Sequence, residues 1–195
     1  MKRLNKKGFT LIELLAVIVI LAILLAIAIP SVSKYINGAK KDTYIVNVKE
    51  YADAAQKELN LVDTDYVAPV NQGDYIIISF AALADTLEKG GKTSSYGGDF
   101  NTNMSFVVVV NEGTAAKPRY GYYIAAADSK GYAIGDGEAK SARVIKSDNL
   151  KSSNVVQVGK TGDNPNGIDK SSFTASQLVG LPSGVTLAGS ATATY

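Results

Sequence analysis

A long apolar run close to the N-terminus dominates the hydrophobic pattern of the chain. Residues 9–29 are apolar except for Thr10 and Glu13. As a helix, this run would span roughly 30 Å at about 1.5 Å per residue, which matches the hydrocarbon core of a bilayer. Basic residues precede it, and such charges stay on the cytoplasmic side of a membrane. The pattern predicts a membrane-spanning helix over residues 9–29 whose N-terminus is cytoplasmic.

From Pro30 onward the helical pattern becomes one-sided. Apolar residues recur at steps of three and four with charged and polar residues between them, which is the period of an amphipathic helix. These apolar positions are Ile45, Val48, Ala52, Ala55, Leu59 and Val62. The sequence therefore predicts that the helix continues over residues 30–62 and stops near Asp63. Pro30 lacks a backbone donor and Gly38 is a weak helix former, so we expect the helix to kink at both positions.

An ordinary secretory signal peptide also begins with basic residues and an apolar stretch. The apolar run over residues 9–29 is longer than the core of such a signal. Its far end, Ile27–Pro30, is a poor match to a small-x-small cleavage site, and the helical pattern continues beyond it. These differences favour a helix that is retained in the mature protein.

Glu13 is the ionisable residue inside the apolar run. A carboxylate costs about 2.5–3.5 kcal/mol at the middle of a bilayer and less near the interface. Two interpretations remain open on this evidence. Glu13 lies close enough to the membrane edge to reach water or headgroups, or it has a functional partner that compensates its charge.

Residues 63–195 form the predicted globular head, in which strands alternate with turns. Strand patterns occur at Tyr75–Ile78, Ser105–Asn111, Arg119–Ala127 and Tyr132–Ile134. The last strand follows a turn at Asp128–Gly131, and the last three together predict an antiparallel meander. One face of this sheet is expected to pack on the amphipathic half of the helix. The predicted fold class is α+β, with a long kinked N-terminal helix on an antiparallel sheet.

A short helix is predicted between the first two strands. Ser79 is placed to cap it, the apolar positions recur over Phe80–Glu88, and Gly90 and Gly91 end it. Four tyrosines in the later strands are expected to fill a half-buried pleated face, with a surface aromatic patch as the alternative. They are Tyr120, Tyr122, Tyr123 and Tyr132.

The C-terminal third of the head is only weakly patterned. Short strands are expected at Val155–Val158 and Val185–Leu187. Thr174 and Gln177 have the spacing that opens a single helical turn.

The amino-acid composition excludes several kinds of catalytic and metal-binding site. The chain has no cysteine and no histidine, which excludes disulfides, thiolate chemistry and histidine-based metal or acid–base sites. Its net charge is +2, but without the basic first eight residues the balance is slightly acidic, so nucleic-acid binding has no electrostatic support. A loop with oxygen ligands misses the spacing of a calcium-binding loop, and we expect an ordinary polar loop there: Asp163, Asn164, Asn166 and Asp169. We expect neither a metal, a cofactor nor catalytic residues.

The segment Lys6-Lys7-Gly8-Phe9-Thr10-Leu11-Ile12-Glu13-Leu14 resembles the signal sequence of type IV prepilins. The resemblance is close over about the first thirty residues. It implies that residues 1–8 are a leader, that a prepilin peptidase cuts between Gly8 and Phe9, and that Phe9 is N-methylated. It gives Glu13 the role of the assembly glutamate and Pro30 that of the helix-kinking proline.

The resemblance also implies a function and partners. The chain is expected to be a structural subunit, the major pilin, of a type IV pilus, which is a helical homopolymer that supports adhesion, surface motility or biofilm formation. Its partners would be the prepilin peptidase, the assembly ATPase and the platform membrane protein. It would lie in the cell membrane before assembly and on the cell surface afterwards. A head without cysteine favours a Gram-positive source.

Besides a minor pilin located at the fibre tip, two other functions remain open. A pseudopilin of a type II secretion or DNA-uptake system shares the same N-terminus. A membrane-tethered enzyme or binding domain would need a constellation of histidine, cysteine or close carboxylates in the head, and the sequence has none that stands out.

Overall fold

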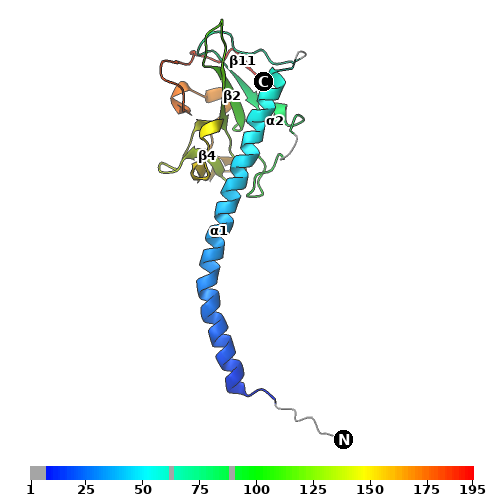
Figure 1. Cartoon of the computed structure of the whole chain (residues 1–195), viewed down its shortest axis with the longest axis vertical. Coiled ribbons are helices and arrows are strands. Elements are labelled where there is room, and N and C mark those ends of the chain that lie inside the picture. Colours follow the sequence, from blue (N-terminus) through cyan, green and yellow to red (C-terminus); the bar gives the residue numbers. More distant parts are fainter. Residues whose placement is uncertain (1–7, 62–63, 88–90) are drawn as a thin grey trace. The chain divides into compact units, whose positions relative to one another are not determined.

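The computed structural model describes residues 8–61, 64–87 and 91–195. The chain divides into two compact units, Met1–Ala39 and Lys40–Tyr195. The fold class is α+β, as predicted: one long apolar N-terminal helix, α1 (Leu11–Leu59), precedes a mostly antiparallel sheet (Figure 1).

Helix α1 is continuous through both units and is 49 residues long. Its part in the second unit is amphipathic, as the sequence predicted, because its buried residues recur at helical spacing. They are Tyr44, Ile45, Val48, Tyr51, Ala52, Ala54 and Ala55. The helix ends at Leu59, and the expected end at Val62 and Asp63 lies outside the described residues.

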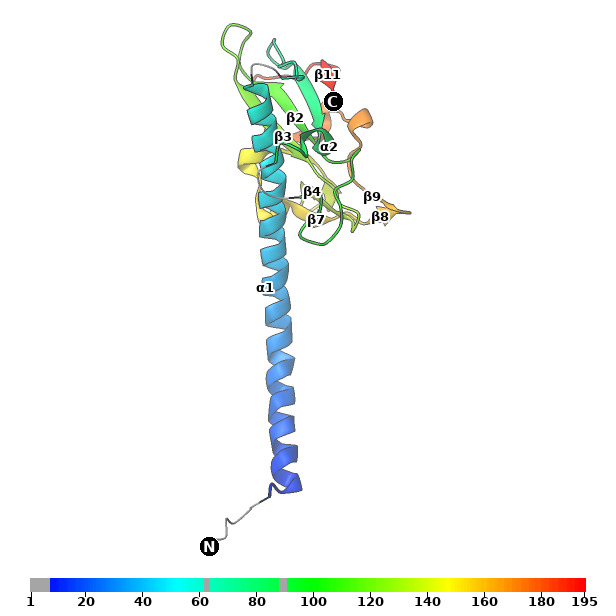
Figure 2. The same ribbon diagram turned by 90° about the vertical axis from the view of Figure 1, so that its right-hand side faces the viewer.

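The second unit is built around a six-stranded sheet in the order β10-β6-β3-β2-β1-β11. Its strands are β1 (Tyr75–Ser79), β2 (Phe106–Asn111), β3 (Tyr120–Ala125), β6 (Val144–Lys146), β10 (Leu178–Val179) and β11 (Ala193–Thr194). The central pairs are antiparallel, and the two-residue edge strands β10 and β11 pair in parallel with β6 and β1. The second half of α1 runs beside this sheet (Figure 2).

Both faces of the six-stranded sheet are buried, which explains why its strands read as continuous apolar runs. Alternate side chains of β1 and β2, such as Ile76 and Val107, pack with Tyr44 and Val48 of α1. The residues between them face a second cluster, which the C-terminal segment covers. Side chains of this cover are Ile168, Phe173, Leu181 and Leu187. The sequence predicted the helix on one face but no cover for the other.

The predicted three-stranded meander is wrong in its third strand. Strands β2 and β3 pair antiparallel as expected, but β4 (Tyr132–Asp136) belongs to a separate sheet with β5 (Ser141–Ala142) and β7 (Val155–Gln157). The turn at Asp128–Gly131 is present, and Gly131 adopts a φ of +84° in it. The place beside β3 is taken by β6, so the meander of the main sheet is β1-β2-β3.

Two other expectations need correction. The helix after Ser79 is α2 (Phe80–Leu83) and does not reach Glu88, because residues 84–86 form turns with i to i+3 bonds. Glu88 and Gly90 lie outside the described residues. No strand forms at Val185–Leu187, where the chain instead lies as cover over the sheet. The Ser79 cap is confirmed, because its hydroxyl accepts from the Ala82 amide.

The remaining elements are short. The strand expected at Val155–Val158 is β7, and the helical turn expected after Thr174 is η4 (Ala175–Gln177). The others are β8 (Lys160–Thr161), β9 (Asn164–Pro165), η1 (Ser147–Asn149), η2 (Ser152–Asn154) and η3 (Lys170–Ser172). These short strands and helical turns give the C-terminal third of the chain its structure, and the chain has no cysteine with which to form a disulfide.

Candidate functional site

The predicted cleavage point lies just before α1 and is accessible. Gly8 and Phe9 are exposed, and the Phe9 side chain is 89% exposed. A Cβ built at Gly8 would meet no described atom within 4 Å. No close contact in the described chain therefore requires a glycine at position 8.

Thr10 and Glu13 form a reciprocal cap at the start of α1. The Glu13 Oε2 atom accepts from the Thr10 amide and from the Thr10 hydroxyl, each at 2.8 Å. The Thr10 hydroxyl oxygen in turn accepts from the Glu13 amide at 3.3 Å. This is the capping-box arrangement, in which each side chain satisfies a free backbone donor of the first turn. Thr10 interrupts the apolar run, and its Thr-x-x-Glu spacing is the sequence signal by which this cap could have been predicted.

The first unit presents an apolar surface on every side of α1. Large apolar side chains over residues 11–29 are each between 50% and 84% exposed. This stretch is long and apolar enough to cross a bilayer. Exposing so large a continuous apolar surface to water is unfavourable. Such a surface marks a site of contact with lipid or with other protein.

Pro30 and Gly38 lie inside α1, and the helix is continuous past both. Pro30 has no amide hydrogen, so it leaves a carbonyl one turn earlier without its usual donor. The Ser31 hydroxyl donates to the Ile27 carbonyl at 3.4 Å in the same turn. A Cβ at Gly38 would meet nothing within 4 Å, so no close contact in the described chain requires a glycine there. The kinks predicted at both positions stay predictions.

Within the second unit, α1 makes side-chain contacts with the rest of the unit from Lys40 onward. The Ser95 hydroxyl donates to the Lys40 carbonyl at 2.6 Å, and the Lys40 ammonium lies 5.6 Å from the centre of the Tyr96 ring. Further along, the Tyr51 ring stacks on Phe80 at a centroid distance of 3.6 Å. Stacked and edge-on aromatic pairs add roughly 0.5–1.5 kcal/mol each beyond their burial. These contacts fix the second half of α1 to the sheet.

A largely buried ion pair joins Glu112, which directly follows β2, to Lys146 of β6. The Lys146 ammonium donates to both carboxylate oxygens of Glu112, at 2.6 and 2.8 Å, and the Tyr123 hydroxyl donates to Glu112 Oε1 at 2.6 Å. A Cβ at Gly121 would lie 2.1 Å from Glu112 Oε1, so the glycine makes room for the carboxylate. The Tyr123 hydroxyl also lies 3.4 Å from the Gly180 carbonyl of the C-terminal cover. No spacing in the sequence pointed to this network.

The tyrosines of the strands pack as expected. Tyr123 is fully buried, whereas Tyr120, Tyr122 and Tyr132 are half-buried against the core. Burial, together with the neighbouring Tyr120 hydroxyl, raises the pKa of Tyr122 to about 12. Burial and the hydrogen bond to Glu112 raise the pKa of Tyr123 further still.

The polar loop over residues 163–169 is stabilised by hydrogen bonds to residues close to it in the chain. The Asn166 side chain accepts from the Thr161 hydroxyl and donates to the Val158 carbonyl. Asp169 accepts from the amide and hydroxyl of Ser171, which lowers its pKa. Among residues 8–61, 64–87 and 91–195, no group of three or more acidic, histidine or cysteine side chains is placed to hold a metal ion.

Comparison with known proteins gives one result. Residues 3–29 match the family described as the prokaryotic N-terminal methylation motif. The match covers Gly8, Phe9 and Glu13 together with the whole apolar run. Neither the curated proteins nor the solved structures gave a match.

Proposed function

We propose, from the type IV prepilin signature that residues 3–29 carry, that this chain is a structural subunit of a type IV pilus. The chain is cut between Gly8 and Phe9, N-methylated on Phe9 and polymerised through the first half of α1. Residues 1–8 are then the leader, residues 9–29 the membrane and assembly helix, residues 30–62 its amphipathic continuation and residues 63–195 the head.

The observation that carries this proposal is the exposed apolar surface of α1 in the first unit. Large side chains over residues 11–29 are exposed on all sides of the helix. Such a surface is stable in lipid, and it is equally stable when packed against other apolar helices. A subunit that moves from a membrane into a fibre exchanges one of these surroundings for the other.

Glu13 sets the register of the assembled helices in this proposal. Cleavage creates a charged amine at Phe9, and an unpaired carboxylate in an apolar fibre core is costly. When Glu13 pairs with the Phe9 amine of a neighbouring copy, neither the carboxylate nor the amine is left as an unpaired charge in the fibre core. The cap that Glu13 makes with Thr10 keeps the carboxylate at the start of α1, at 2.8 Å from the Thr10 amide.

The prepilin signature implies processing by a prepilin peptidase and delivery to an assembly machinery. We further propose an assembly ATPase and a platform membrane protein as the partners that extract the processed subunit from the membrane. After assembly the subunit lies on the cell surface, and as the major pilin it serves adhesion, surface motility or biofilm formation. A pseudopilin would share the N-terminal chemistry but would not yield long surface fibres.

The test is a charge-removing variant of the assembly residue. Glu13→Gln is expected to be processed and membrane-bound normally but to reduce the yield of sheared fibres about tenfold or more, because the pairing across subunits is lost. Lys34→Gln, which removes an exposed charge from the same helix, is the matched control and should assemble normally. Mass spectrometry gives the N-terminus, and electron microscopy of sheared cells gives the fibres.

Two results would overturn the proposal. A mature product that begins anywhere other than at Phe9 contradicts the cleavage. Normal fibres from Glu13→Gln contradict the role of the carboxylate. Correct processing without any fibre from the wild-type chain favours the pseudopilin.

A further inference from the structure

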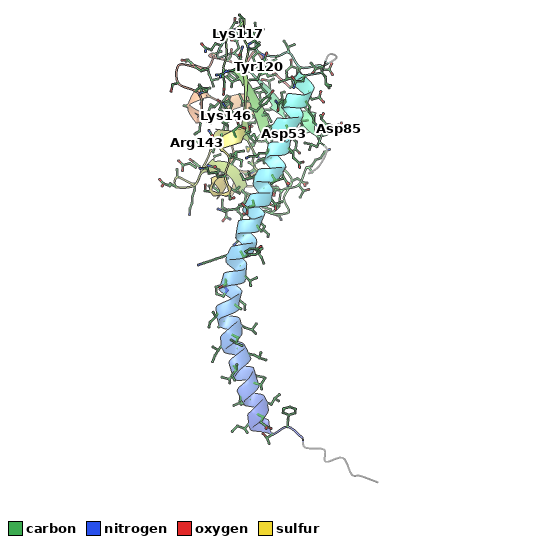
Figure 3. The ribbon with its side chains drawn as sticks, in the orientation of Figure 1. Asp53, Asp85, Lys117, Tyr120, Arg143 and Lys146 are labelled. Atoms are coloured by element: carbon green, nitrogen blue, oxygen red, sulfur yellow. The ribbon has the colours of Figure 1, made fainter. Side chains whose placement is uncertain are left out.

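A polar recess of about 220 Å³ lies in the second unit between α1, β3 and η1. Its lining residues include Asp53 and Gln56 from α1, Tyr120 and Tyr122 from β3, and Asp148 from η1. Lys146 also lines it, beside Asp53 in Figure 3. Tyrosine faces and carboxylates together are the surroundings that a cationic side chain prefers.

The charge of this recess is negative. Lys146 is the cation among its lining residues, and its ammonium is held by both oxygens of Glu112. Asp53 and Asp148 are exposed, and within residues 8–61, 64–87 and 91–195 neither carboxylate makes a side-chain hydrogen bond or an ion pair. The recess therefore offers two carboxylates and two aromatic rings to a cation from outside.

A basic hairpin projects from another part of the same unit. The loop between β2 and β3, residues 112–119, carries Lys117 and Arg119, which are both exposed. The loop is rigid, because Thr114 and Lys117 exchange two backbone hydrogen bonds of 3.1 Å. At its base, the buried Asn111 side chain accepts from the amides of Gly113 and Arg119 at 2.9 and 3.2 Å.

The hairpin and the recess lie at different levels of the unit. Figure 3 shows Lys117 at the end of the head, with Tyr120 below it and with Asp53 of α1 and Lys146 of β6 lower still. A contact between two different patches is heterologous, and when it does not close into a ring it generates a helical filament. A rigid loop also loses little entropy on docking, which favours the contact.

We propose that the basic hairpin of one copy docks in the acidic recess of the next copy, with Lys117 between Asp53 and Asp148 and against the ring of Tyr120. This rests on the proposed function, since it supplies a contact between heads in the same polymer. The apolar helices provide most of the buried surface, and the hairpin contact fixes the rotation of each head relative to its neighbour.

Charge reversal tests the contact. Asp148→Lys and Lys117→Asp, each alone, are expected to reduce the yield of sheared fibres about tenfold, because like charges then meet at the contact. The double variant again places opposite charges at positions 117 and 148, while the unchanged Asp53 then faces a like charge, so it is expected to recover only part of the wild-type yield but clearly more than either single variant. Asp85→Lys, a reversal at an exposed carboxylate that does not line the recess, is the matched control and should change the yield little.

A cross-link gives a second readout, and the chain suits it because it has no cysteine. In fibres of the double variant Lys117→Cys/Asp148→Cys, mild oxidation should join copies into a ladder of dimers, trimers and higher species. Either single cysteine variant lacks the partner thiol across the contact and should stay monomeric, and Lys117→Cys/Asp85→Cys should give no ladder.

The outcomes separate this inference from the proposed function. If the wild-type chain forms fibres but single reversals leave the yield unchanged, or the double variant is no better than the singles, the hairpin contact is wrong and the pilin function stands. If fibres form but the cysteine pair gives no ladder, the hairpin contact is equally wrong. If the wild-type chain forms no fibres at all, the proposed function fails and this contact fails with it.

Discussion

The ion pair between Lys146 and Glu112 makes a sharp prediction about the stability of the head. Lys146→Met removes the ammonium but keeps a long apolar stem. Among the described residues, it leaves the Glu112 carboxylate with the Tyr123 hydroxyl as its only side-chain partner. The Glu112 side chain is only 7% exposed, so its charge cannot turn to water. A buried charge that loses its partner costs about 3–5 kcal/mol in unfolding free energy.

The lower end of this range applies, because the Lys146 side chain retains 19% exposure and the pair is partly screened. A loss of about 3 kcal/mol lowers the Tm of a unit of this size by roughly 6–12 °C, at about 2–4 °C per kcal/mol. The double variant Glu112→Gln/Lys146→Met should recover much of the loss. It no longer buries a charge, and the amide still accepts from Tyr123.

Near-ultraviolet circular dichroism of the full chain in detergent micelles measures this unfolding. The chain has 11 tyrosines and no tryptophan, and only Tyr35 lies outside the unit Lys40–Tyr195, so the signal reports on the head. Lys160→Met, which removes an exposed cation, is the control and should change the Tm by no more than about 2 °C. A similarly small change for Lys146→Met would refute the reasoning that the pair is buried and structural.

Three further predictions follow from other contacts of the chain. Asp128→Ala should destabilise the head by about 3 kcal/mol in denaturant unfolding, because the fully buried carboxylate accepts from the Ser94 hydroxyl and from two backbone amides of its turn; an unchanged midpoint would contradict this. The pKa of Tyr122 is raised to about 12 in the folded chain, so on raising the pH the unfolded chain loses this proton first, near pH 10. The stability that this difference contributes should be complete below pH 10 and be lost as the pH rises towards 12. Tyrosinate absorbance measures the titration, and denaturant unfolding at each pH measures the stability. Thr10→Val should cost about 1 kcal/mol and speed amide exchange in the first turn of α1, whereas Thr10→Ser should not, and equal exchange in both would disprove the cap.

The N-terminal motif and the head differ in how far comparison with known proteins explains them. The motif over residues 3–29 is short and local, and it is recognised without any knowledge of the head. The head gave no match to a solved structure, so its contribution has to be argued from its own contacts. The basic hairpin and the acidic recess are the features of the head through which we propose that it takes part in assembly.

The sequence by itself determined the local features. An apolar run over residues 9–29 and a one-sided pattern behind it specify a helix through their period alone, and β1, β2 and β3 appeared where β-branched and aromatic residues cluster. Thr10 and Glu13 met in the cap because their spacing is fixed by the helix itself.

Only the tertiary structure decided which strands are neighbours. Short turns suggested that β4 follows β3 in one sheet, but β6 takes that place, because strand pairing depends on packing among residues far apart in the chain. The same holds for Glu112 and Lys146, which are 34 positions apart, and for Tyr123 with Gly180. Local pattern fixes a helix turn by turn, whereas these contacts exist only once the whole sheet and its C-terminal cover have closed over them.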